Sequence, residues 1–76
     1  MQLHTYFFKV NLPPVGAPFD TPAFDIGGDH ASLDDAVSVA RMTADRENVN
    51  AFTVEESGRE VARQMKVDGE WTADHA

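Results

Sequence analysis

Residues 32–45 read SLDDAVSVARMTAD, and this stretch decides the fold because its apolar residues recur at helical spacing. Five of them predict an apolar stripe on one helix face: Leu33, Ala36, Val37, Ala40 and Ala44. Ser32 is a favourable N-cap, and the acids Asp34 and Asp35 suit the positive end of the helix dipole. The small alanines predict that the helix, which should end near residues 47–48, packs closely against a sheet.

Two strand candidates precede the helix. Residues 3–12 are rich in aromatic and β-branched side chains, and both faces of this stretch carry apolar residues, which predicts a central strand. Residues 13–22 contain all four prolines and are expected to form a loop. A short strand is predicted at 23–26, and we expect Gly27 and Gly28 to end it in a turn.

The chain after the helix predicts a series of short antiparallel strands. Residues 52–55 and 60–67 alternate apolar and polar side chains, as half-buried strands do, with Gly58 in the turn between them. Three apolar residues of the second strand should share one face: Val61, Met65 and Val67. The dipeptide at 68–69, Asp-Gly, is a hairpin signal, so residues 70–72 should return as a last strand.

These elements predict one domain, residues 1–76, of the α+β class: an antiparallel sheet of three to five strands with one α-helix packed on one face. A chain this short buries only about 60 % of the surface that its unfolded form exposes, so we expect a small free energy of unfolding. There is no cysteine, so disulfides cannot add to it. We expect Trp71 to close the core, with a role as a binding anchor as the alternative. The predicted buried residues are Phe8, Leu33, Val37, Ala40, Phe52 and Val54.

The charge of the chain is strongly acidic and unevenly distributed. Thirteen acidic residues against six basic ones give a formal net charge of −7. No Lys or Arg lies between Lys9 and Arg41, and this interval holds five aspartates: Asp20, Asp25, Asp29, Asp34 and Asp35. Such a field repels nucleic acid and favours a protein partner with a basic surface. The alternative interpretation is that the acids only keep the protein soluble.

Two apolar residues interrupt the polar face of the predicted helix. Val39 and Met42 lie on adjacent turns and away from the apolar stripe, so we interpret them as a contact surface. Beside them, the helix start is expected to gather Asp29, Asp34 and Asp35. These five residues are the predicted partner-binding site.

The sequence contains no recognisable catalytic or metal-binding motif, so we expect neither an enzyme nor a cofactor. Ser32 and Ser57 lack the G-x-S-x-G context of a nucleophile and have no neighbouring base. The three histidines, at positions 4, 30 and 75, are not at ligand spacing from one another. The best nucleus for a metal site would be Asp29-His30, and we predict that no metal binds.

No segment of the chain predicts membrane insertion or export. Residues 1–6 show no basic stretch followed by an apolar run, and no stretch approaches the roughly 18 apolar residues of a membrane span. We therefore expect a cytoplasmic protein.

The pattern of the second half of the chain resembles that of the type I-F anti-CRISPR proteins. Its residues are Ser32-Leu33, Ala36, Ala40, Thr53-Val54-Glu55, Gly58, Val61-Ala62, Gly69 and Trp71. The pattern is also similar to several families of bacterial domains with no assigned function. The proline-rich stretch 13–22 and the greater acidity depart from it. The resemblance implies a protein that docks on a CRISPR effector and blocks DNA access without enzymatic activity.

The leading hypothesis is therefore an acidic, non-enzymatic module that binds a basic protein surface. The first alternative is a homodimeric bacterial domain, in which an exposed sheet face or the Val39 and Met42 surface is the self-contact. The second alternative is a small-ligand or metal-binding domain.

Overall fold

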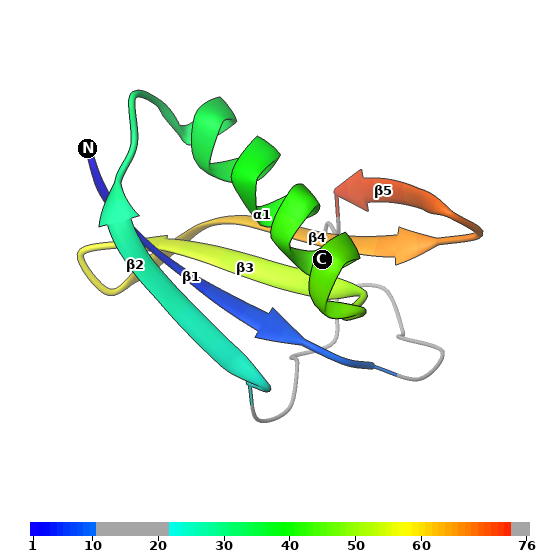
Figure 1. Ribbon diagram of the computed structural model, residues 1–76. Coiled ribbons are helices and arrows are strands. Elements are labelled where there is room, and N and C mark those ends of the chain that lie inside the picture. The colour runs from blue at the N-terminus through cyan, green and yellow to red at the C-terminus, as the bar shows by residue number, and fades with distance from the viewer. Residues whose placement is uncertain (11–21, 74–76) are drawn as a thin grey trace.

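The structure, a computed structural model, describes residues 1–10 and 22–73, and within them it forms one sheet with one helix across it (Figure 1). The elements are β1 (Gln2–Phe8), β2 (Phe24–Asp29), α1 (Leu33–Glu47), β3 (Ala51–Glu56), β4 (Arg59–Val67) and β5 (Glu70–Ala73). The five strands pair antiparallel in the order β2-β1-β3-β4-β5. The helix covers β1 and β3 on one face. The predicted α+β fold is confirmed.

Strand β1 lies inside the sheet, between β2 and β3, as its two apolar faces predict. Leu3, Thr5 and Phe7 are buried, and the side chains of Leu3 and Phe7 belong to the core beneath the helix. Tyr6 and Phe8 point to the opposite face, because successive side chains of a strand alternate. The strand ends at Phe8 rather than at residue 12. Residues 9 and 10 are not part of a strand, and residues 11–12 of that prediction, with the loop predicted at 13–22 up to residue 21, fall outside the described residues.

The expectation that Gly27 and Gly28 form a turn is wrong. Both lie within β2, where Gly27 is paired with His4 and Gly28 with Leu3. A Cβ atom added to Gly27 would lie 3.2 Å from Nδ1 of His4, which is closer than most such contacts. Glycine at this position therefore makes room for the imidazole ring, and the strand continues to Asp29.

Helix α1 begins and ends where the sequence predicts. The Ser32 hydroxyl accepts a hydrogen bond of 3.1 Å from the backbone N–H of Asp35, and Asn48 closes the helix in the left-handed conformation. The alanines of the predicted stripe are buried, together with Thr43. Leu33 and Val37, predicted to be buried, are only half-buried, because Leu33 is the first residue of the helix and Val37 lies at the edge of the covered stripe.

One flank of α1 is tied to β4 by two side-chain contacts. Arg41 Nε donates a 2.9 Å hydrogen bond to Oε1 of Gln64. Lys66 Nζ forms a 2.7 Å ion pair with Oδ1 of Asp45. This flank therefore faces β4, and the other flank of the helix faces the β2 side of the sheet.

The β3–β4 hairpin contains an irregularity that the sequence does not reveal. Ser57 and Gly58 form its turn with positive φ angles of 53° and 81°. The register shifts between Val54 and Glu55, so Val61 is an extra residue on β4. Met65 contributes to the face opposite the helix, whereas Val61 packs against the core on the helix side. The prediction that these two share a face is wrong.

The main core lies between α1 and the sheet. Its buried residues are Leu3, Phe7, Ala36, Ala40, Ala44, Val49, Phe52 and Val54. The Trp71 ring lies 5.3 Å from the ring of Phe52 and packs against this cluster from β5. Trp71 therefore closes one end of the core, as predicted. A smaller cluster of Phe8, Ala51 and Met65 lies on the opposite face of the sheet.

Candidate functional site

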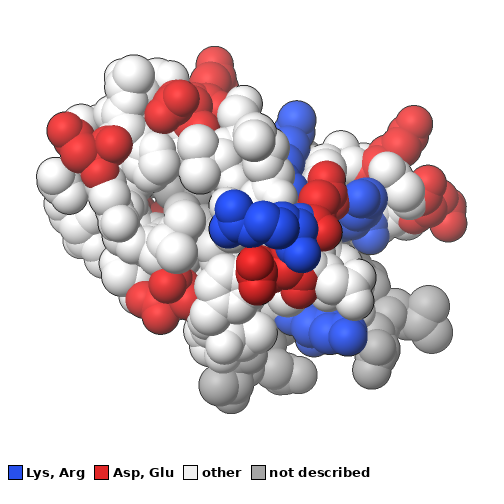
Figure 2. All heavy atoms as spheres, in the orientation of Figure 1, with Lys and Arg blue, Asp and Glu red and all other residues white. Residues whose placement is uncertain are grey.

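Four exposed aspartates lie along β2 and the start of α1. Asp25 lies near the start of β2 and Asp29 at its end, while Asp34 and Asp35 lie in the first turn of α1, and we name these four residues the acidic end. Figure 2 shows Asp and Glu side chains without Lys or Arg over β2 and the start of α1, whereas Lys and Arg side chains lie beside acidic ones over the second half of α1 and over β4. Basic side chains are thus absent from the β2 side of this face.

Asp29 lies at the end of β2 rather than at the helix start, because β2 continues through the two glycines. Its Oδ1 accepts a 2.5 Å hydrogen bond from the N-terminal ammonium group of Met1. That ammonium group lowers the pKa of Asp29, through the hydrogen bond first and its charge second. The carboxylate stays largely exposed and remains open to a second cation.

His30 connects Asp29 to the helix start. Its Nδ1 lies 3.2 Å from Oδ2 of Asp35, and its charge also helps to lower the pKa of Asp29. Asp34 is exposed beside them. The structure therefore brings together the three aspartates that the sequence predicts as partner-binding, with a histidine that the prediction did not include.

The two apolar residues of the predicted site lie on the flank of α1 that faces the β2 side. Asp35, Val39 and Met42 follow one another at i, i+4 and i+7, so they form one row along the helix. Met42 is 72 % exposed. Val39 is half-buried, which differs from its predicted place on the polar face, because it lies closer to the covered stripe.

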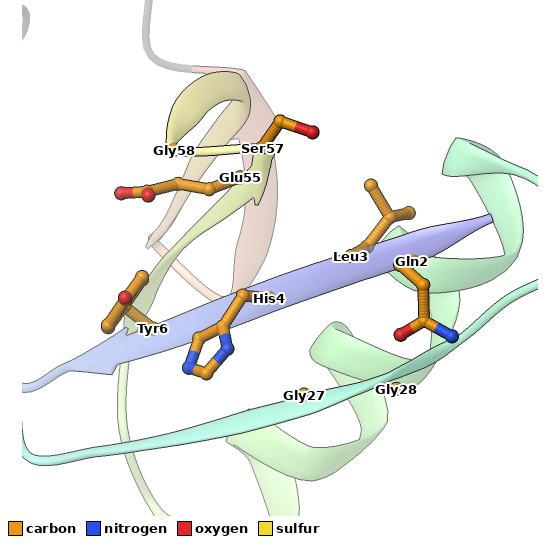
Figure 3. A pocket seen from close by; sticks show the side chains of 9 residues that line it. All are labelled: Gln2, Leu3, His4, Tyr6, Gly27, Gly28, Glu55, Ser57 and Gly58. Carbon is orange, nitrogen blue, oxygen red and sulfur yellow. The ribbon is translucent and has the colours of Figure 1, made fainter.

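A hollow of about 550 Å³, which local sequence patterns do not predict, lies on the sheet face opposite the helix (Figure 3). Its walls are Gln2, Leu3, His4, Tyr6, Gly27, Gly28, Glu55, Ser57 and Gly58. His4 lies in one cross-strand row with Gly27 and Glu55. The hollow forms because Gly27 contributes no side chain to this row on the β2 side.

His4 is held by β2 and by its neighbour on β1. Its Nε2 is hydrogen-bonded to the carboxylate of Asp25, and its ring lies 4.7 Å from that of Tyr6 at an angle of 35°. Its Nδ1 is the atom that lies over Gly27. Both ring nitrogens are therefore directed at β2.

Ser57 lines the same hollow from the β3–β4 turn (Figure 3). In the described part of the chain its hydroxyl makes no hydrogen bond with His4. A serine nucleophile needs a base within hydrogen-bond reach, so the geometry does not pair these two residues. Within residues 1–10 and 22–73, no group of three His, Cys, Asp or Glu side chains could hold a metal ion.

No family model matches the chain, and no curated protein or solved structure matches it. Among the described residues there is no helix with the length and apolar character needed to cross a membrane.

Proposed function

We propose that the protein is a non-enzymatic binding module whose acidic end docks on the basic surface of a partner protein in the cytoplasm. The observation that carries the proposal is an acidic surface without basic side chains. Four exposed aspartates, Asp25, Asp29, Asp34 and Asp35, lie along β2 and the start of α1, while the Lys and Arg side chains of the same face lie over the second half of α1 and over β4. Charge complementarity of this kind speeds encounter with a basic partner and disfavours acidic ones.

An apolar contact beside the charges adds to the support. Met42 is the most exposed large apolar side chain on the helix, and it lies in one row with Asp35. Charged residues set the association rate, whereas a desolvated apolar contact lengthens the lifetime of a complex. A surface with both parts suits a partner that must be found quickly and then held.

The sharpest form of the proposal is a phage-type inhibitor of a CRISPR effector. The resemblance of residues 32–71 to the type I-F anti-CRISPR proteins supports it. Nucleic-acid-binding surfaces hold phosphates with Lys and Arg, and an exposed cluster of carboxylates competes for the same side chains. Bound at such a surface, the acidic end would exclude DNA without any chemical reaction.

The orientation of His4 favours binding over catalysis. The imidazole is engaged by Asp25 and Tyr6 and lies against Gly27. These contacts indicate that His4 holds the neighbouring side chains of the hollow in place. The hollow itself favours a second candidate, a small-ligand domain, because it combines an aromatic wall from Tyr6 with the carboxylate of Glu55.

The proposal is tested by surface plasmon resonance against a purified type I-F effector complex. We expect the association rate to fall as salt rises, because the Debye length is only about 8 Å at physiological ionic strength. Asp34→Asn combined with Asp35→Asn should slow association, and Met42→Ala should instead speed dissociation. The matched control is Asp68→Asn with Glu70→Gln, which removes the same charge from the β4–β5 turn at the other end of the sheet.

Two outcomes would count against the proposal. Equal effects of the two double variants would mean that net charge, rather than the acidic end, sets the association rate. If the effector complex does not bind at all, the inhibitor form is rejected. The general form then depends on whether host proteins captured by the wild type are lost with the first double variant and kept with the control.

A further inference from the structure

We propose that the outer edge of β2 accepts an extended basic segment of the partner as a sixth strand of the sheet. The inference rests on the proposed function and specifies how the partner is held. Strand β2 is the first strand of the order β2-β1-β3-β4-β5, and no other strand of the described residues pairs with its outer side. An unpaired edge presents backbone donors and acceptors to an added strand.

The register identifies the backbone groups that point outward. The N–H of His30 donates a 2.8 Å hydrogen bond to the carbonyl of Met1, so His30 faces β1. Hydrogen-bonding direction alternates along an antiparallel strand. Asp25, Gly27 and Asp29 therefore direct their N–H and C=O groups away from β1 and toward an incoming strand.

The side chains along this edge specify the chemistry of that strand. On the face opposite the helix, the edge carries the carboxylates of Asp25 and Asp29. On the helix side it carries Phe24 and Ile26, which are only half-buried because α1 packs over β1 and β3. An added strand alternates its side chains in the same way. The segment that fits has basic residues on one face and apolar residues on the other.

Gly27 sets the place of the central basic residue. It lies between the two aspartates along β2, and the His4 ring covers it on the face opposite the helix. Neighbouring strands lie about 4.8 Å apart, so a Lys or Arg opposite Gly27 lies beside the His4 ring rather than over the glycine. At that place its cation is flanked by the carboxylates of Asp25 and Asp29, which attract it.

A second copy of the chain is disfavoured at the same edge. Two β2 strands paired antiparallel about Gly27 would place Asp25 of one copy opposite Asp29 of the other. Like charges directly opposite each other destabilise a strand pair. The charges that oppose self-association are those that a basic strand neutralises.

The test uses the whole protein, amide hydrogen exchange measured by NMR, and a synthetic peptide, acetyl-Val-Lys-Val-Arg-Val-Lys-Val-amide. We expect the peptide to slow exchange at the amides of Asp25, Gly27 and Asp29 by at least about tenfold, since edge amides open to water become paired. A peptide of the same composition in scrambled order, with the bases adjacent, should protect them less.

N-methylation of the peptide provides a control that leaves the protein unchanged. Methyl groups on one alternate set of peptide nitrogens should abolish protection, and methyl groups on the other set should preserve it, because only one set faces β2. Equal effects of the two sets, or no binding of the alternating peptide, would overturn the inference.

Two further outcomes separate this inference from the proposed function. Peptide-induced shifts confined to Asp34 and Asp35, without protection on β2, would leave a basic partner at the acidic end and reject strand addition. Protection of β2 that grows with protein concentration in the absence of peptide would replace the basic segment by a second copy.

Discussion

Gly27 shows how a single missing side chain arranges a surface. Its Cα hydrogens leave space for the His4 ring, and the ring in turn reaches Asp25. A glycine inside a strand otherwise costs roughly 0.5–1 kcal/mol relative to alanine. The presence of glycine at this position is therefore explained by the ring beside it, and not by backbone conformation.

Substitution of the two neighbouring glycines separates these effects. Gly28→Ala should raise the free energy of unfolding by up to about 1 kcal/mol, because the new methyl group meets only His30 Nε2, at 3.8 Å. Gly27→Ala should gain less or lose stability, since its methyl group meets His4 Nδ1 at 3.2 Å and displaces the ring. Urea denaturation measures both, and the His4 ring resonances should shift only in the second variant. Equal stabilisation by the two alanines would contradict this account.

Asp29 should titrate below the ordinary value for an aspartate, about 3.9, because the N-terminal ammonium stabilises its charged form. A carboxyl group whose pKa is lowered by folding contributes stability above its unfolded pKa, and that contribution is lost as the pH falls through the folded pKa. Carboxyl-detected NMR gives the midpoint directly. Adding Gly-Ser before Met1 moves the ammonium away and should raise the midpoint of Asp29. If the titration midpoint of Asp29 were the same with and without the extension, the N-terminal ammonium would not be the cause of its lowered pKa.

At the scale of elements, β3 is the strand on which the core depends. It pairs with β1 and β4, and the side chains of its first four residues are buried. Phe52 has no exposed surface and lies between the rings of Phe7, at 6.3 Å, and Trp71, at 5.3 Å. Phe52 therefore joins the packing of the inner strand β1 to that of the outer strand β5.

Phe52→Ala should therefore cost roughly 3–5 kcal/mol of unfolding free energy, as deletion of a buried aromatic ring does. Small domains often have little more than this in total, so the variant should be largely unfolded at moderate temperature. Circular dichroism during heating measures the effect. Val67→Ala, at an exposed position of β4, is the control and should stay within about 0.5 kcal/mol of wild type. A Phe52→Ala protein that melted within a few degrees of wild type would contradict the packing described.

The sequence predicts the helix well and the sheet edges poorly, for physical reasons. Caps such as Ser32 and a stripe at helical spacing are local signals, so both ends of α1 follow from neighbouring residues. The role of Gly27 depends on His4, more than twenty positions away, and the place of Val61 depends on a bulge opposite Val54. Such long-range partners leave no trace in local periodicity.

The candidate site likewise has one part that depends on local sequence and one part that depends on long-range contacts. Asp34, Asp35 and Met42 are exposed because of their places on one helix, and these could be read from the sequence. The hollow around His4 assembles side chains from three strands, so it could not be predicted before the strand order was known. The same is true of the free edge of β2.

For the whole molecule, a net charge of −7 combined with its uneven distribution predicts a monomer at low salt. Light scattering at increasing protein concentration should show one mass, that of a single chain. Asp25→Asn with Asp29→Asn removes the like charges from the β2 edge and should allow dimers to form. Asp68→Asn with Glu70→Gln changes the net charge equally and should not. A wild-type dimer at low salt would instead favour the homodimeric alternative.

The position of Trp71 determines what its fluorescence can report. It is the only tryptophan in the chain, and its indole lies against Phe52 with Lys66 Nζ 5.9 Å from the ring. The emission spectrum therefore reports on β5 and its end of the core, whereas the β2 edge lies across three strands from it. Titration with a strand that binds at β2 should leave this emission unchanged. Urea should shift the emission to longer wavelength as soon as β5 detaches from the sheet. Tryptophan fluorescence therefore measures the loss of β5 separately from binding at β2, without an added dye.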